Sequence, residues 1–164
     1  MPTLYAAPNF SVALAESLFH DLPRNLPDIF IARSKVDALV VSWIRPLHDL
    51  RLASFRGPAL RRLRVEWNQL IGSLPTCYSR TQLWARAAHR LGGDVQGIEW
   101  SSRQYDGEAS FLLFGDRIDL EGLEGHEGPT AIEIVEDRIP LGGPRYETEV
   151  LRECEQADIT LVSA

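Results

Sequence analysis

Three polar residues that could do chemistry follow one another in the middle of the chain: Ser101, Ser102 and Arg103. They fill the gap between a short apolar run and a longer one, where a plain hairpin needs only an Asn-Gly or Asp-Gly turn. Hydroxyl groups and a guanidinium beside a strand end can bind a phosphate or a ribose oxygen. The alternative is an ordinary polar loop, which is the commoner meaning of a lone Ser-Ser-Arg tripeptide.

A second candidate is Glu16, a carboxylate at the margin of an apolar helix face. At 100° per residue, Val12, Ala15 and Phe19 share that face. If the face packs against the core, the carboxylate is partly desolvated, which suits it to accept a hydrogen bond from a sugar hydroxyl. The simpler interpretation is a solvated glutamate paired with His20 one turn later, and the helix alone favours it.

No pattern in the sequence indicates a hydrolase-type nucleophile or a metal site. There is no Gly-x-Ser-x-Gly motif, and no histidine stands in an acid–base register with either serine. The only cysteines, Cys77 and Cys154, are far apart, and the four histidines are scattered. We therefore expect no metal cofactor.

Composition limits the classes of function. The 164 residues, 45% of them hydrophobic, fit one compact domain with a sizeable core. A formal net charge of −6 argues against a protein that coats nucleic acid or an anionic membrane. The basic run at residues 56–64 is therefore interpreted as a solvated helix face. With no membrane-length apolar run, no signal-peptide pattern and two free thiols, the sequence predicts a cytoplasmic protein.

The elements that must position these residues follow from periodicity and capping. Helices are expected at residues 11–21, with Ser11 as the N-cap, and at 59–71, 80–91 and 146–156. Strands are expected at residues 3–7, 36–44, 97–100, 109–115, 131–135 and 159–163. Helices gather in the first half and strands in the second, without regular βαβ alternation, which predicts an α+β fold.

The apolar spacing of the two central helices predicts that they share a core with the strand that ends the Ser-Ser-Arg connection. The large side chains expected to be buried there are Leu63, Trp67, Leu83, Trp84 and Phe111.

Two separated blocks of the sequence resemble the RES-domain family. In the first, LYAAPNFSVALAESLFHD at residues 4–21, the strand tyrosine Tyr5 stands eleven residues before Glu16. The second, YSRTQLWARAAHRLGGDVQGIEWSSRQYDGEASFLLFGDRI at residues 78–118, has a helix ending at glycine and a glycine-to-aromatic strand. A serine-containing turn and an apolar strand ending in phenylalanine follow. The agreement of both blocks in order makes the resemblance fairly specific.

The resemblance implies an ADP-ribosyltransferase-like fold, a mixed β-sheet core with flanking helices. It also implies cleavage of the nicotinamide–ribose bond of NAD by hydrolysis, phosphorolysis or ADP-ribosyl transfer, with NAD as substrate and no metal. By position Glu16 and Ser102 would be catalytic, with Ser101 as the alternative serine. Tyr5, Ser101 and Arg103 would contact NAD.

Members of the family are typically toxins of bacterial type II toxin–antitoxin systems, silenced by a helix-turn-helix antitoxin. The resemblance therefore implies one RES domain over residues 1–164 with such an antitoxin as a possible partner. We expect no direct contact with nucleic acid or with a membrane, and a homo-oligomer is possible. The family's arginine lies before its tyrosine, whereas only four residues precede Tyr5, so we expect the N-terminal part to be missing. Arg24, Arg33 or Arg103 is the alternative cation. The other function considered is a truncated or decayed non-catalytic RES module that keeps only the scaffold or the antitoxin-binding surface.

Overall fold

A mixed four-stranded sheet forms the centre of the computed structural model. Its strand order is β1-β6-β5-β4, in which β4 runs parallel to β5 and the other neighbours are antiparallel. The strands are β1 (Thr3–Ala6), β4 (Leu52–Phe55), β5 (Gly97–Ser101) and β6 (Ala109–Phe114). The structure describes residues 2–23, 26–72, 78–91, 93–118 and 131–163. The mixed sheet and its flanking helices confirm the predicted α+β class.

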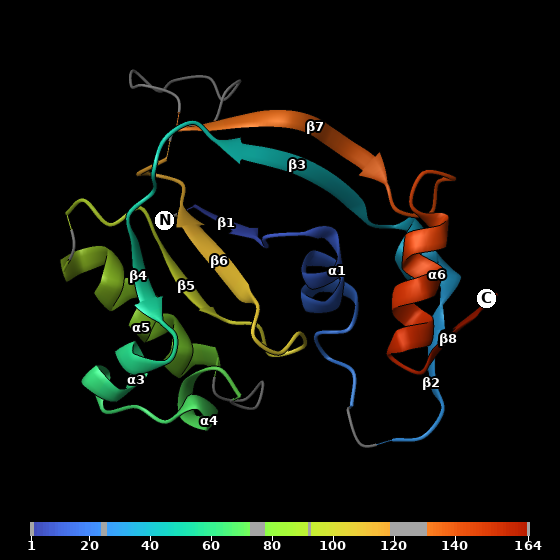
Figure 1. Ribbon diagram of the computed structural model, residues 1–164, viewed down its shortest axis with the longest axis horizontal. Helices are drawn as coiled ribbons and strands as arrows, with labels where there is room; N and C mark the ends of the chain where they lie inside the picture. Colours follow the sequence, from blue (N-terminus) through green and yellow to red (C-terminus); the bar gives the residue numbers. More distant parts are fainter. Residues whose placement is uncertain (1, 24–25, 73–77, 92, 119–130, 164) are drawn as a thin grey trace.

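Two further strand pairs extend the fold beyond the central sheet. The parallel pair consists of β2 (Ile29–Ala32) and β8 (Ile159–Val162). The antiparallel pair consists of β3 (Val40–Pro46) and β7 (Ile132–Pro140). In Figure 1 the β3–β7 ribbon arches above the central sheet and reaches the unit that contains β2 and β8 on the right.

Helices cover one face of the central sheet. They are α3 (Pro58–Leu63), α4 (Trp67–Leu70) and α5 (Tyr78–Leu91). Because successive strand residues point to opposite faces, Leu112 and Phe114 of β6 both face these helices. They form a buried cluster against which Trp84, Ala85 and Ala88 of α5 pack.

The opposite face of the sheet packs under the β3–β7 ribbon. Leu113, the alternate residue of β6, forms a buried cluster with Ile118 and Ile132, and Ile44 of β3 packs against it. Ile132 is fully buried at the start of β7. The sheet therefore has apolar packing on both faces.

A third core joins segments from both ends of the chain. It lies between α1 (Phe10–Leu18), α2 (Arg33–Asp37), α6 (Glu147–Gln156) and the β2–β8 pair. Leu14 of α1, Val150 and Cys154 of α6, and Ile159 of β8 are all buried in it. Burial raises the pKa of the Cys154 thiol, and the neighbouring carboxylate of Glu153 raises it further, so Cys154 stays a neutral thiol. The other cysteine, Cys77, lies outside the described residues.

The start of α1 differs from the predicted one. The helix begins at Phe10, and its N-cap is Asn9, whose side-chain oxygen accepts a hydrogen bond from the backbone N–H of Val12 at 3.0 Å. Ser11 was the predicted cap, and that prediction is wrong. Its hydroxyl instead donates to Glu153 at 2.7 Å, which ties α1 to α6.

Two other predicted boundaries are also wrong. The helix predicted over residues 59–71 is two short helices, because Arg64 takes a left-handed conformation (φ 57°) and ends α3. Glu66 then starts α4 with a capping box to Gln69. The strand predicted over residues 36–44 is helical as far as Asp37, where α2 ends.

The predicted core is correct only in part. Trp84 and Phe111 are partly buried. Leu63, Trp67 and Leu83 are 40%, 42% and 59% exposed, so their predicted burial is wrong. The reason on α5 is that small alanine side chains beside Trp84 face the sheet and let the helix approach closely, which turns Leu83 outward.

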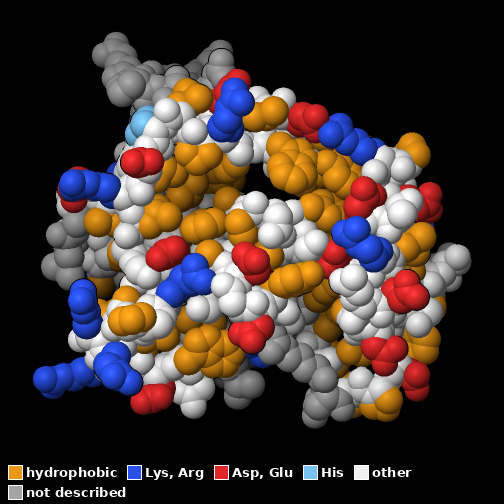
Figure 2. All heavy atoms as spheres, viewed as in Figure 1, with side chains coloured by type: hydrophobic (Ala, Val, Ile, Leu, Met, Phe, Trp, Pro, Cys, Tyr) orange, Lys and Arg blue, Asp and Glu red, His pale blue; other side chains and the backbone are white. Residues whose placement is uncertain are grey.

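The surface carries a basic region over α3. Arg61, Arg62 and Arg64 are exposed there, as the interpretation of a solvated helix face expects. Figure 2 shows basic side chains at the lower left of the molecule, where Figure 1 places α3. Across the described part of the chain, no helix has the length and apolar character needed to cross a membrane.

Candidate functional site

The carboxylate of Glu16 meets the turn that follows β5. Its Oε1 accepts a hydrogen bond from the Ser102 hydroxyl at 2.5 Å and another from the Arg103 backbone N–H at 2.8 Å. A third comes from the backbone N–H of Gln104 at 3.2 Å. One oxygen of Glu16 therefore fixes three consecutive residues of the turn.

Ser102 and Gln104 complete this junction. Ser102 is only 4% exposed, and its hydroxyl accepts a hydrogen bond from the Tyr105 backbone N–H at 2.9 Å while it donates to Glu16. The Gln104 side-chain amide donates to the carbonyls of Phe19 and His20, both at 3.0 Å, at the end of α1. Since every link is a hydrogen bond of normal length, the turn and the helix hold each other in a fixed arrangement.

The two carboxylate oxygens of Glu16 are not equivalent. Among the described residues, Oε2 makes no hydrogen bond, whereas Oε1 has three donors. The side chain is partly buried, so Oε2 can accept a hydrogen bond from a ligand hydroxyl in a partly dry setting. The alternative pairing with His20 is not observed, because the His20 ring contacts Asp21 at 2.9 Å.

Of the remaining predicted site residues, only Arg103 takes part in this junction. Tyr5 is 69% exposed and does not take part in its hydrogen bonds. Its ring packs edge-on against Trp100, with ring centroids 6.2 Å apart. Ser101, the alternative serine, ends β5 and is partly buried. Arg103 contributes its backbone N–H to Glu16.

Arg33, one of the alternative cations, is engaged away from the junction. Arg33 forms ion pairs with Glu147 at 2.8 Å and with Asp37 at 3.5 Å, between α2 and α6. The hydrogen bond with Glu147 raises the pKa of Arg33. The Arg33 guanidinium is therefore already paired with the carboxylates of Glu147 and Asp37. Arg24 lies outside the described residues.

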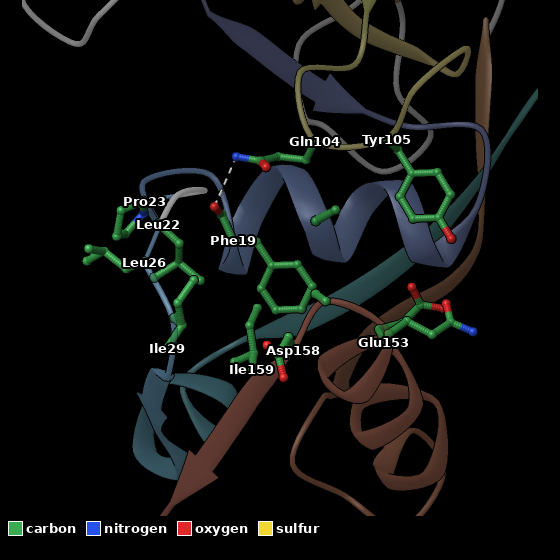
Figure 3. Close-up of a pocket in the computed structure, with 13 residues that line it drawn as sticks. Phe19, Leu22, Pro23, Leu26, Ile29, Gln104, Tyr105, Glu153, Asp158 and Ile159 are labelled. Atoms are coloured by element: carbon green, nitrogen blue, oxygen red, sulfur yellow. Dashed lines mark hydrogen bonds between the residues drawn. The ribbon is translucent and has the colours of Figure 1, made fainter.

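A cavity of about 440 Å³ lies beside α1, between the turn and α6. Figure 3 shows Phe19 pointing into it, with Gln104 and Tyr105 above and Ile159 below. Its lining includes the carboxylate of Glu153, which is 4% exposed and accepts hydrogen bonds from Ser11 and Arg152. The sequence analysis missed Glu153. The signal was available, because Val150 and Cys154 at helical spacing place it beside an apolar face.

A second cavity, of about 360 Å³, lies between β1 and α5 and includes Tyr5 in its lining. Its lining residue His89 contacts Asp116 at 2.9 Å. Burial of the Asp116 carboxyl opposes ionisation, but hydrogen bonds from His89 and from its own backbone outweigh that effect and lower the pKa of Asp116. Within the described ranges, no three His, Cys, Asp or Glu side chains gather to hold a metal ion.

The family relation follows from a sequence comparison. A protein-family model described as the RES domain matches residues 1–130, which is most of the chain. The chain belongs to the RES-domain family. Comparison with curated proteins and with solved structures gives no match.

The family match confirms the resemblance drawn from the two sequence blocks. In this RES domain the matched residues run from β1 past β6 and contain Tyr5, Glu16 and Ser102. They end before β7, α6 and β8, which complete two of the three cores. The extent of a single domain over residues 1–164 stays a prediction.

Proposed function

We propose that this RES domain cleaves the bond between nicotinamide and ribose in NAD. Glu16 would act on the ribose, and Ser102 would hold the Glu16 carboxylate in position. Family membership supports an NAD-acting module of the toxin–antitoxin type. The sequence resemblance supplies the substrate and the reaction.

One observation carries the proposal: the 2.5 Å hydrogen bond between Glu16 and Ser102, two residues separated by 86 positions in the sequence. The resemblance assigns catalysis to these two residues, and the fold brings them into direct contact. Because Oε1 is occupied by the turn, the carboxylate is oriented before a ligand arrives and Oε2 is left open. Such preorganisation is what a site needs to stabilise charge as it develops.

The chemistry requires few groups. When the C1′–N bond breaks, nicotinamide leaves as a neutral molecule with the bonding electron pair, and positive charge develops on the ribose. A carboxylate hydrogen-bonded to a ribose hydroxyl stabilises that charge in the transition state. The oxygen of water or phosphate, or a protein side chain, then bonds to C1′ and loses its proton to solvent.

We further propose that this activity makes the protein a toxin that consumes cellular NAD, restrained by a helix-turn-helix antitoxin in the cytoplasm. The proposal follows from the family resemblance. Co-expression of the antitoxin should abolish both NAD loss and growth arrest if it is correct.

The direct test is an assay of NAD loss and nicotinamide release by the purified chain, with and without added phosphate. The Glu16→Gln variant should lose turnover by at least about a hundredfold, because one charged transition-state contact contributes several kcal/mol. Glu155→Gln on the exposed face of α6 is the matched control and should keep wild-type turnover.

The assay also distinguishes the second function, a non-catalytic module. If the folded wild-type chain releases no nicotinamide under any of these conditions, the catalytic proposal is wrong. A wild-type rate in Glu16→Gln would show that the reaction uses another carboxylate.

A further inference from the structure

The cavity between the turn and α6 has an apolar end and a polar end. Four residues between α1 and the start of β2 line the apolar end: Leu22, Pro23, Leu26 and Ile29. Tyr105 of the turn and Glu153 of α6 line the polar end. Figure 3 shows these two groups on opposite sides of Phe19. The volume of about 440 Å³ lies within the range of small-molecule sites.

The polar end holds a carboxylate that is almost fully buried. Glu153 is 4% exposed, and its Oε1 accepts hydrogen bonds from Ser11 at 2.7 Å and from Arg152 at 3.1 Å. Its Oε2 accepts no hydrogen bond from any residue that the structure describes. A buried carboxylate oxygen is costly without a donor, so a ligand that donates to Oε2 would stabilise this arrangement.

The charge of the lining favours a cation. Asp158, which follows α6, adds a second carboxylate, and the described lining residues include no arginine or lysine. Arg152 compensates part of the charge of Glu153, but its side chain is 55% exposed, so solvent screens that pair. The ring of Tyr105 at the same end can also attract a cation through its face.

The cavity shares residues with the Glu16 junction. Gln104 belongs to the lining, its backbone N–H donates to Glu16 at 3.2 Å, and its side chain ties the turn to the end of α1. Tyr105 also belongs to the lining, and its backbone N–H donates to Ser102. A ligand that packs against Gln104 and Tyr105 therefore contacts the turn that positions Glu16.

We propose that this cavity binds a small organic cation, a protonated amine on an apolar body. The body would lie among Leu22, Leu26 and Ile29, where it removes apolar surface from water. The ammonium would donate to Oε2 of Glu153 through one of its three N–H groups. Glu153 and Asp158 follow the residues that the family model matches, so the site uses a part of the chain outside that match. The inference does not depend on the proposed function.

Binding of phenethylamine tests the site without any reaction. An amine of this size should bind with a Kd on the order of 1 mM, measured by titration with amide-detected NMR. The side-chain amide signals of Gln104 and Gln156, both in the lining, should shift. The neutral analogue phenethyl alcohol and the anion hydrocinnamate should bind at least about tenfold more weakly, because neither forms an ion pair with Glu153.

Substitution of Glu153 tests the polar end. Glu153→Gln keeps the size of the side chain and an oxygen for Ser11, and it should raise the Kd for phenethylamine at least about tenfold. The matched control, Glu155→Gln, makes the same charge change on the exposed face of α6 and should change the Kd less than about twofold. Thermal melts check that both variants are folded.

Asp158→Asn is a second variant that keeps the inference testable if Glu153→Gln fails to fold. Asp158 has a left-handed backbone (φ 55°), which asparagine also adopts, so the substitution should leave the fold intact. Because Asp158 is exposed, the Kd should rise only about threefold.

The inference is overturned if phenethylamine binds no more tightly than phenethyl alcohol or hydrocinnamate, or if Glu153→Gln and Glu155→Gln weaken binding equally. Binding that leaves the amide signals of Gln104 and Gln156 unmoved would also overturn it. The assay of NAD cleavage stays independent. A chain that binds the amine but never cleaves NAD keeps the cation site and rejects the proposed function, whereas NAD cleavage without amine binding does the reverse.

Discussion

At the residue scale, Ser102 connects the proposed site to the stability of the fold because its hydroxyl both donates and accepts. It donates to Glu16 and accepts from the backbone N–H of Tyr105. In Ser102→Ala the partly buried N–H of Tyr105 loses its acceptor and Glu16 loses its shortest hydrogen bond. We expect a loss of about 1–3 kcal/mol in the free energy of unfolding, measured by urea denaturation.

The neighbouring serine is the control for this prediction. Ser101→Ala should change the free energy of unfolding by less than about 0.5 kcal/mol, because no described hydrogen bond depends on its hydroxyl. If Ser102 positions Glu16, kcat for NAD should fall in Ser102→Ala while KM changes little. If Ser101→Ala and Ser102→Ala change the free energy of unfolding and kcat equally, Ser102 has no special role in positioning Glu16.

The Asp116 carboxylate predicts a specific pH dependence. Its pKa in the folded protein lies below the ordinary value of 3.8, so the ionised form favours folding. This contribution is present above the unfolded pKa and is lost as the pH falls through the lower, folded pKa. Because the side chain is 45% exposed, we expect Asp116→Asn to lower stability by less than about 1 kcal/mol near pH 6.

The difference between wild type and Asp116→Asn should shrink as the pH falls below 3.8 and disappear once the pH lies below the lowered pKa of the folded state, where the carboxyl is protonated in both states. Urea denaturation near pH 6 and over a series of acidic pH values measures it, and Asp106→Asn in the exposed turn is the control. A destabilisation that persists unchanged at the lower pH would show that the substitution acts through packing instead.

The sequence could identify single residues of the site but not their contacts. The position of Glu16 at the edge of an apolar face was visible in the helical periodicity, and its distance from Tyr5 carried the family resemblance. Its bonds to Ser102 and the next two backbone N–H groups depend on long-range packing that no local pattern encodes.

At the scale of elements, α5 shows that periodicity can predict a helix correctly and still assign the wrong residues to its buried face. The predicted stripe contained both Leu83 and Trp84, which are adjacent and cannot share the centre of one face. The structure turns Trp84 inward against Phe55, with ring centroids 6.1 Å apart. Hydrophobicity alone favoured Leu83 over the alanines, whereas close approach to the sheet requires small side chains.

Substitutions on α5 should therefore separate the two faces. Trp84→Ala should lower the free energy of unfolding by about 3 kcal/mol, because it empties an aromatic site in the core beneath the sheet. Leu83→Ala should cost less than about 1 kcal/mol, since Leu83 is 59% exposed. Chemical denaturation of both variants measures this, and equal losses would contradict the orientation of the helix.

At the scale of the whole molecule, the third core extends beyond the residues that the family model matches. Val150 on α6 is 2% exposed and packs with residues of α1, whereas its neighbour Leu151 is 47% exposed. Val150→Ala should lower the free energy of unfolding by about 2 kcal/mol, because the loss combines transfer and cavity terms. Leu151→Ala should lower it by less than about 1 kcal/mol.

A thermal melt of the two variants measures this difference. A single cooperative transition that moves with Val150→Ala would show that the part of the chain after residue 130 unfolds together with α1. Separate transitions would show that the segments are independent.

The parallel pairing of β2 with β8 has a consequence for synthesis of the chain on the ribosome. Ile29 pairs with Ile159. At translation rates of about 5–20 residues per second, roughly ten seconds therefore pass between the synthesis of β2 and the synthesis of β8. Glu16 is made before that interval begins and Ser102 after its midpoint, and both are made before α6 exists to cover Leu14 and Phe19. During this interval the nascent chain exposes an apolar helix face that chaperones can bind. The Glu16 site therefore acquires its full packing only when translation is nearly complete.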